Sequence, residues 1–206
     1  MNRLASAAGY AEHAAALAEQ YEGIPFEALH RDVLHLFPTE PGMVLDIGAG
    51  SGRDAAAMAR RGHRVVAIEP TEALRREGQR IHADVPIEWI DDALPALATL
   101  CASGRVFDLV LLTAVWMHLD LQERAQAMQT VANLLSAGGI VTMSLRHGPV
   151  PAGRRMYEVS ADETIALGRG HGLEPVHYSE RDDAQGRTDV SWSFVALRKP
   201  YPHTLR

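Results

Sequence analysis

VLDIGAGSGRDA, residues 44–55, places three glycines between an apolar run and an alanine-rich stretch. The apolar run from Met43 to Ile47 is short and continuous, which is typical of a buried parallel strand. The spacing from Arg53 to Arg61 predicts a helix. Glycine adopts positive φ at little cost and lets a ligand approach the main chain, while the first N–H groups of a helix favour an anion. The stretch therefore predicts a strand, a ligand-binding turn and a helix.

Apolar runs and helical patterns alternate along the rest of the chain, as a parallel sheet covered on both faces requires. Two helices are expected between Leu4 and Phe37, and Ala137-Gly138-Gly139 is expected to end the helix before the fifth strand. The further strands expected are His63–Ile68, Ile87–Ile90, Phe107–Thr113 and Ile140–Leu145, and the further helices are Glu72–Ala83, Pro95–Ala102, Leu121–Leu135 and one between Ser160 and His171.

The C-terminal part predicts two strands, Glu174–Ser179 and Val190–Leu197, on either side of a turn-rich loop. Two strands joined in this way indicate an antiparallel pair at the end of the sheet. The expected fold class is α/β, doubly wound, with a mostly parallel seven-stranded sheet, helices on both faces and an antiparallel C-terminal pair.

The composition is that of a globular chain of 206 residues, 47% hydrophobic, with a formal net charge of −6. This length favours a single domain, residues 1–206. The longest uncharged apolar stretch in the middle of the chain, Leu109–Leu119, is shorter than the roughly 20 residues of a membrane span, and Glu12 and Glu19 interrupt the N-terminus, so neither a span nor a secretory signal is expected. The single cysteine, Cys101, excludes an internal disulfide and favours a cytoplasmic protein.

The spacing of the glycines tests two other motifs. A nucleoside-triphosphate loop needs G-x-x-x-x-G-K-[ST], and the segment contains no lysine. The dinucleotide motif G-x-G-x-x-G, counted from Gly48 and Gly50, needs a glycine at the position of Arg53. Both are disfavoured. The remaining pattern is D-x-G-x-G-x-G, with Asp46 two residues before the first glycine.

With this pattern the chain resembles the class I S-adenosylmethionine-dependent methyltransferases, whose first motif is such a strand, acidic residue and glycine loop. The resemblance covers roughly Tyr10 to Arg198. Its other landmarks follow in the family's order: VVAIEP at 65–70, WIDDALPAL at 89–97, FDLVLLTAVWMHL at 107–119 and LLSAGGIVTMSL at 134–145. The family implies transfer of a methyl group to an oxygen or nitrogen of an acceptor.

The resemblance implies S-adenosylmethionine as the cofactor. It places Glu69 where the family has an acid that binds both ribose hydroxyls, a task that suits a carboxylate. Asp92 falls at the position that meets the adenine amino group, with Asp91 as the competing choice, and Asp46 also fits a cap of the glycine loop. The implied cofactor-binding residues are Tyr21, Asp46, Gly48, Ala49, Gly50, Ser51, Arg53, Glu69, Pro70, Asp92, Ala93, Leu94, Thr113 and Ala114.

The residues that contact the methyl acceptor are expected to follow the fourth and fifth strands. Trp116 and Arg146 are the expected substrate-binding residues, since a guanidinium can hold a carboxylate with two hydrogen bonds. His118 and His147 are the candidate catalytic bases. A packing role for His118 and a solvated loop charge for Arg146 remain as alternatives.

The acceptor itself is expected to be a small molecule. The acidic net charge argues against nucleic acid, although Arg146, Arg154 and Arg155 form a local basic patch. LTAVWM also replaces the N-P-P-[YF] signature of methyltransferases that act on DNA. No metal is expected, because His30 and His35 fall on different helix faces.

Within the domain, similar methyltransferases imply three parts. Residues 1–40 are expected to form a helical lid carrying Tyr10 and Tyr21, residues 41–146 the cofactor-binding core, and residues 147–206 a C-terminal part with a substrate-facing segment. Two rival hypotheses stay open: an S-adenosylmethionine-binding enzyme of different chemistry, such as cyclisation, and a non-catalytic binding subunit. The sequence does not determine the oligomeric state.

Overall fold

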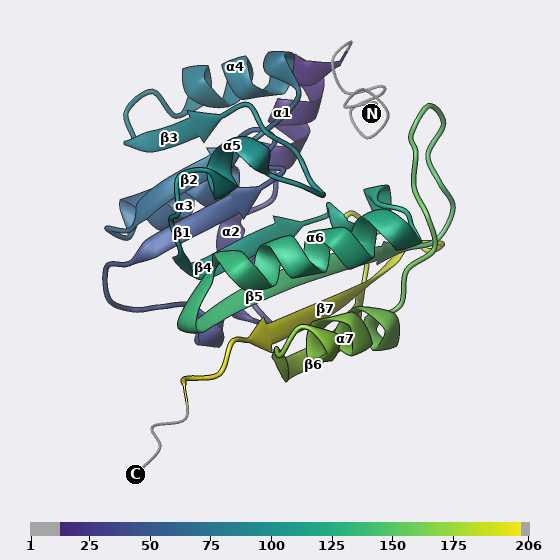
Figure 1. Ribbon diagram of the computed structural model, residues 1–206. Helices are drawn as coiled ribbons and strands as arrows, with labels where there is room; N and C mark the ends of the chain where they lie inside the picture. The colour runs from purple at the N-terminus through teal and green to yellow at the C-terminus, as the bar shows by residue number, and fades with distance from the viewer. Residues whose placement is uncertain (1–12, 203–206) are drawn as a thin grey trace.

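The computed structural model describes residues 13–202, so Tyr10 and the start of the expected first helix lie outside the described residues. Figure 1 shows the strands crossing the middle of the molecule with helices on both sides. In chain order the elements are α1 (Ala14–Glu22), α2 (Phe26–His30), the 3₁₀ turn η1 (Leu34–Leu36), β1 (Met43–Ile47), α3 (Arg53–Arg60), β2 (Arg64–Ile68), α4 (Glu72–Ile81), β3 (Ile87–Ile90), α5 (Ala98–Cys101), β4 (Phe107–Thr113), the 3₁₀ turn η2 (Trp116–His118), α6 (Leu121–Leu134), β5 (Leu135–His147), α7 (Ala161–Gly170), β6 (Glu174–Asp182) and β7 (Ser191–Arg198).

The seven strands form one sheet in the order β3-β2-β1-β4-β5-β7-β6. Strands β1 to β5 pair in parallel, whereas β7 is antiparallel to both β5 and β6. The order changes direction at β1, which pairs with β2 on one side and with β4 on the other. In doubly wound sheets a ligand binds at such a switch point, beyond the carboxyl ends of the strands. The expected fold class is confirmed, and the fold directs attention to the turn after Ile47.

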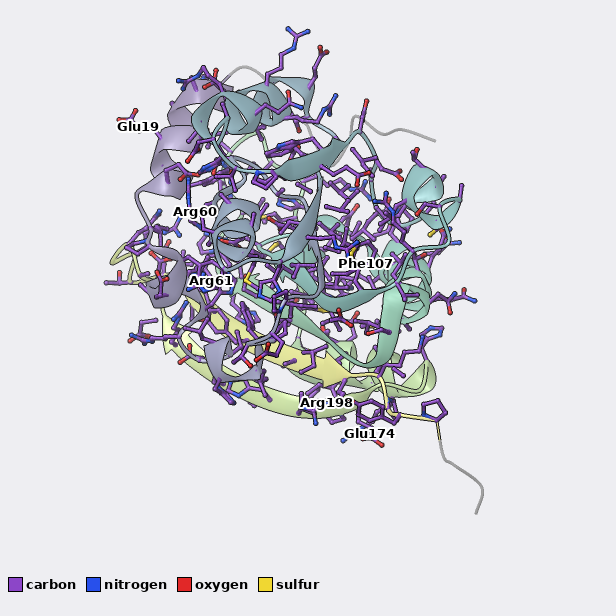
Figure 2. All side chains as sticks on the ribbon, turned by 90° about the vertical axis from the view of Figure 1, so that its left-hand side faces the viewer. Glu19, Arg60, Arg61, Phe107, Glu174 and Arg198 are labelled. Carbon is purple, nitrogen blue, oxygen red and sulfur yellow. The ribbon has the colours of Figure 1, made fainter. Side chains whose placement is uncertain are left out.

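Each face of the sheet buries its own hydrophobic core. In β4, Val110 and Leu112 belong to the core beneath α5, α6 and α7, whereas Leu109 and Leu111 belong to the core beneath α2 and α3. Successive side chains of a strand point to opposite faces, so a strand buried on both faces must be apolar throughout. Figure 2 shows Phe107 among the interior side chains. This explains the continuous apolar runs in the sequence.

The structure corrects the expected start of the fifth strand. β5 begins at Leu135, directly after α6, rather than at Ile140 after a glycine turn. Leu135 pairs with Phe107, and the register shifts before Ile140 pairs with β4 again. Gly138, at φ 81°, lies within this irregular part of the strand and does not cap the helix.

Two other expected boundaries also change. β6 runs to Asp182 rather than to Ser179, because Arg181 and Asp182 continue the antiparallel pairing with β7. The helix expected from Pro95 is shorter, Ala98–Cys101, since Leu97 adopts a left-handed backbone conformation at φ 45°. Both corrections arise from pairing or backbone geometry that local spacing does not reveal.

The N-terminal segment packs against the rest of the chain at two places. Leu17 of α1 contacts Leu74 of α4 in a small separate cluster, and Phe26 of α2 joins the core beneath α3. The two helices therefore lie over the glycine turn from one side. None of the helices within residues 13–202 has both the length and the apolar character needed to cross a lipid bilayer.

Candidate active site

A cavity of about 370 Å³ opens at the carboxyl ends of β1, β2 and β4, within the size range of small-ligand pockets. Every residue that the sequence analysis expected to bind the cofactor lines this cavity, as do His118 and Arg146. Trp116 and His147 do not line it. The structure therefore brings residues of all five sequence landmarks to one site.

The glycine turn leaves little room for side chains. Gly48, at φ 71°, lies so close to Val115 that an added Cβ would be 2.6 Å from Val115 Cγ2. At Gly50, at φ 57°, a Cβ would be 3.2 Å from the Tyr21 ring. Both positions combine a left-handed backbone with a close approach, and such positions favour glycine. The turn thus exposes main chain to the cavity.

Glu69, at the end of β2, is the buried acid of the cavity. Its Oε2 accepts a hydrogen bond of 2.9 Å from Gly50 N, and its Oε1 accepts one of 2.8 Å from Thr71 N. Burial raises the pKa of Glu69, and these two backbone N–H groups oppose the rise by stabilising the charged form. The Thr71 side chain donates a further hydrogen bond to Glu69, and a carboxylate can accept about four hydrogen bonds, so capacity for a ligand remains. This arrangement fits a ligand with two neighbouring hydroxyls.

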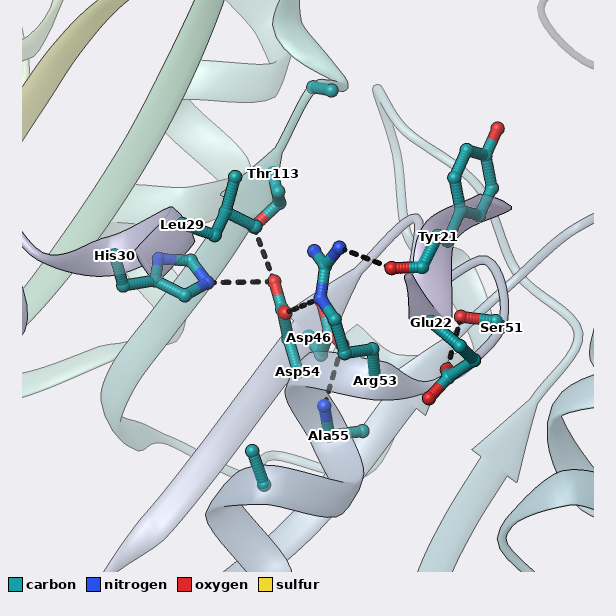
Figure 3. Close-up of polar contacts among 12 residues, drawn as sticks. Tyr21, Glu22, Leu29, His30, Asp46, Ser51, Arg53, Asp54, Ala55 and Thr113 are labelled. Atoms are coloured by element: carbon teal, nitrogen blue, oxygen red, sulfur yellow. Dashed lines mark hydrogen bonds and ion pairs between the residues drawn. The ribbon is translucent and has the colours of Figure 1, made fainter. Parts of the chain in front are cut away.

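A second buried acid, Asp54, organises the other side of the turn (Figure 3). Its Oδ1 accepts a hydrogen bond of 2.7 Å from Arg53 Nε. Its Oδ2 accepts two hydrogen bonds, one of 2.9 Å from His30 Nε2 and one of 2.7 Å from Thr113 Oγ1. Burial alone would raise the pKa of Asp54, but the charges and hydrogen bonds of Arg53 and His30 hold it well below its usual value. Asp54 is therefore an ionised anchor that ties α2, α3 and β4 together.

Asp46, the acid of the first motif, has a different environment. Asp46 is 1% exposed, and its Oδ2 accepts a hydrogen bond of 3.1 Å from Ala55 N at the start of α3. Burial raises the pKa of Asp46 well above its usual value, and the nearby charge of Asp54 adds to the rise. The structural alternative for Asp46, a cap on the helix after the glycine loop, is thus present in the structure.

The N-terminal helices are attached to the turn by polar contacts. Arg53 Nη1 donates a hydrogen bond of 2.9 Å to the carbonyl of Tyr21, and Ser51 Oγ donates one of 2.7 Å to the Glu22 carboxylate (Figure 3). His82 Nε2 also lies 3.1 Å from the Glu22 carboxylate. Burial opposes ionisation of Glu22, yet the hydrogen bonds from His82 and Ser51 lower its pKa overall. The end of α1 is therefore fixed beside the cavity.

Asp92, rather than Asp91, faces the cavity after β3. Asp92 is 4% exposed. One of its carboxylate oxygens accepts a hydrogen bond of 2.9 Å from Ala93 N, and the other accepts one of 3.0 Å from Leu100 N. Asp91 is more exposed and pairs with Arg75 at 3.6 Å. Asp92 therefore lines the cavity, and its carboxylate holds the turn into α5.

His118, in η2 after β4, also lines the cavity. Its Nδ1 is 2.7 Å from the carbonyl of Arg155, which can only accept, so Nδ1 carries the proton and Nε2 is the basic nitrogen. Burial lowers the pKa of His118, and the charges of Arg154 and Arg155 lower it further. The imidazole is therefore neutral near pH 7 and can accept a proton.

Two expected site residues lie elsewhere. Trp116 is fully buried in the core, because the first residue of η2 points between the sheet and α6, so it cannot contact a substrate in the cavity. His147 follows Arg146 in β5 and therefore points to the opposite face of the sheet, where its Nε2 lies 2.7 Å from Ser193 Oγ. These two expectations are corrected.

The cavity also contains functional residues that sequence reasoning missed. Arg181, Asp183 and Arg187 come from the end of β6 and the loop before β7, and Arg154 comes from the connection between β5 and α7. None belongs to a sequence motif. The only signal was the local basic patch near Arg146, of which Arg155 turns toward Asp120 and Glu123 instead. Within residues 13–202, no three His, Cys, Asp or Glu side chains are grouped as metal ligands.

Residues 44–139 match the family described as "Methyltransferase domain". An uncharacterized methyltransferase of Mycobacterium tuberculosis is 32% identical over 128 residues, which are 58% of this chain and 62% of that protein. The matched part thus spans less than two thirds of the relative's length.

Solved structures share the fold. The 1,6-didemethyltoxoflavin-N1-methyltransferase of Burkholderia thailandensis, determined with 1,6-didemethyltoxoflavin and S-adenosylhomocysteine, is 22% identical with a TM-score of 0.67, over 92% of this chain and 89% of that chain. The [4+2]-cyclase SpnF is 14% identical with a TM-score of 0.65, over 91% and 81%. Residues 44–139 thus resemble a methyltransferase domain, and the chain shares the fold of these solved structures.

Proposed function

We propose that the protein transfers a methyl group from S-adenosylmethionine to an oxygen or nitrogen of a small-molecule acceptor. The observation that carries this proposal is Glu69, a buried carboxylate that is fixed by Gly50 N and Thr71 N and faces the cavity. Its remaining lone pairs suit the two ribose hydroxyls of the cofactor. The bound cofactor would supply an electrophilic methyl group on a sulfonium centre.

The other end of the cofactor would meet Arg53. Two of the five guanidinium N–H donors of Arg53 bond to Asp54 and to the Tyr21 carbonyl. Because Arg53 lines the cavity, its remaining donors suit the carboxylate of the cofactor. The Asp54 network would hold the guanidinium in place for this task.

The protein's own contribution would be to align the reactants, exclude water and accept a proton. The N-terminal helices, attached through Glu22 and Tyr21, would act as the lid over the cofactor. His118 Nε2 would accept the proton that the acceptor loses, since burial keeps the imidazole neutral. The proposal also includes a single domain, a cytoplasmic location and no nucleic-acid substrate, as the composition favours.

Calorimetry with S-adenosylmethionine and S-adenosylhomocysteine tests the proposal. We expect micromolar binding to the wild type and at least tenfold weaker binding to Glu69→Ala, about 1.4 kcal/mol. Glu72→Gln, which removes an exposed carboxylate from α4, is the matched control and should bind as the wild type does. Failure of the wild type to bind either compound would overturn the proposal.

Product analysis then separates methyl transfer from other chemistry. Turnover that releases S-adenosylhomocysteine supports transfer. Release of methylthioadenosine, or acceptor conversion without consumption of S-adenosylmethionine, would refute it.

A further inference from the structure

Arginine side chains gather at the end of the cavity opposite the cofactor residues. Arg146 and Arg181 lie directly across β7 from each other, since both pair in register with Trp192, and directly paired residues share one face of a sheet. Arg154 and Arg187 line the same part of the cavity from the two loops beyond these strands. Four arginines from four separate segments therefore line the cavity, and Arg154 and Arg187 lie close enough to Arg146 to lower its pKa.

Two of these arginines are already neutralised by carboxylates. Arg181 pairs with Asp32 at 3.2 Å and lies 4.1 Å above the Phe194 ring. Arg187 forms a two-pronged pair with Asp183, at 2.7 Å and 3.0 Å. Asp183 is fixed further by Trp192 Nε1 at 2.9 Å. These pairs form one wall of the part of the cavity that the four arginines line, here called the arginine end.

Arg146 is different, because its hydrogen bonds go only to uncharged groups. Its Nη1 donates to the carbonyls of Pro149 and Gly148, at 2.8 Å and 3.4 Å. Burial and the neighbouring charges of Arg187 and Arg154 lower the pKa of Arg146, against the opposing charges of Asp183 and Asp189. Among the described residues, Arg146 is thus a cavity-lining arginine whose side-chain hydrogen bonds go to main-chain carbonyls rather than to a carboxylate.

We infer that the methyl acceptor is a small carboxylate whose anionic group binds Arg146, with Arg154 beside it. This inference rests on the proposed function, since it assigns the acceptor of the same site. A guanidinium without a carboxylate partner among the described residues suits a carboxylate ligand, and Trp192 and Phe194 also line the cavity, which suits a flat apolar body. The chain as a whole carries a net charge of −6, so general attraction of anions is not the cause. His118 lines the same cavity and would face the nucleophilic atom of the acceptor.

Benzoate and its neutral counterpart benzamide are the probes for this inference, titrated into the S-adenosylhomocysteine complex and followed by NMR. We expect benzoate to bind at least tenfold more tightly than benzamide. Arg146→Gln should weaken benzoate binding at least fivefold and leave benzamide binding and S-adenosylhomocysteine affinity unchanged. Arg154→Gln should act in the same direction. Arg169→Gln, which removes an exposed charge from α7, is the matched control and should change nothing.

The outcomes separate this inference from the proposed function. If S-adenosylhomocysteine binds but benzoate binds no better than benzamide, the carboxylate assignment is wrong and the methyltransferase proposal stands. Equal benzoate affinity in the wild type and in both arginine variants overturns the inference as well. If S-adenosylhomocysteine does not bind, the proposed function fails, and the benzoate titration of the free protein still tests whether the arginines form an anion site.

Discussion

The two ends of the cavity are built in opposite ways. The end of the cavity around the glycine turn, where we propose that the cofactor binds, is called the cofactor end. There the carboxylates of Asp46, Glu69 and Asp92 accept hydrogen bonds from backbone N–H groups of the adjoining turns. At the arginine end, the charged groups come from β5, β6 and two long connections, one of which rises beyond the sheet in Figure 1 as the green segment before α7. Three acids of the first end are held by backbone N–H groups that follow closely in the chain, whereas the charged residues of the second end come from segments that only the sheet brings together. The difference teaches that the first end depends on local turns and the second on strand pairing.

The largest effect on stability should come from removing a buried carboxylate, and Asp54 at the cofactor end is compared here with Asp183 at the arginine end. Asp54→Ala leaves Arg53, His30 and Thr113 without their buried partner, and we expect a loss of about 3–5 kcal/mol in unfolding free energy. Asp183→Ala should cost only about 1–2 kcal/mol, because the exposed Arg187 can turn to water.

Urea unfolding of both variants measures this difference. Equal losses would show that the arginine end is as rigid as the cofactor end, which would break the comparison.

A pair of glycines tests the same contrast at the backbone. Gly48→Ala combines a left-handed backbone with a Cβ 2.6 Å from Val115, and we expect a loss of about 2–4 kcal/mol together with weaker S-adenosylhomocysteine binding. Gly153, at φ 75°, has no atom within 4 Å of an added Cβ, so Gly153→Ala should cost only about 1 kcal/mol and leave that binding unchanged. Thermal unfolding and calorimetry report both effects. A larger loss of unfolding free energy for Gly153→Ala than for Gly48→Ala would contradict the proposed contrast between the two ends of the cavity.

The smallest effect concerns the pH dependence contributed by His118. Burial lowers the pKa of His118 in the folded state, whereas an unfolded histidine has a pKa near 6.5. Below that pH the unfolded chain binds the proton more readily, so the stability that His118 contributes at pH 8 is lost as the pH falls. His118→Gln should therefore show a shallower fall in unfolding free energy between pH 8 and pH 5.

The exposed His171 supplies the control for this measurement, because His171→Gln should keep the slope of the wild type. An unchanged slope in His118→Gln would exclude a buried, neutral His118.

The fold, and the residues that line the cavity around the glycine turn, were predictable because their signals are local. A strand, a glycine turn and a helix follow one another within residues 44–55, and Glu69 ends the next strand in the same way. The start of β5 was missed because Leu135 pairs with Phe107, a partner distant along the chain. Trp116 and His147 were assigned to the site from their position after a strand, but the direction of each side chain decides otherwise.

The sequence by itself determined the parallel sheet, the glycine turn and the acids at the strand ends, since apolar runs, helical spacing and glycine spacing are patterns among near neighbours in the chain. Only the tertiary structure decided which arginines meet. Arg146, Arg154 and Arg187 belong to different segments, and the antiparallel register of β5, β7 and β6 brings those segments together. The physical reason is that charges act through space, so a charged site made of distant segments leaves no spacing pattern in the chain.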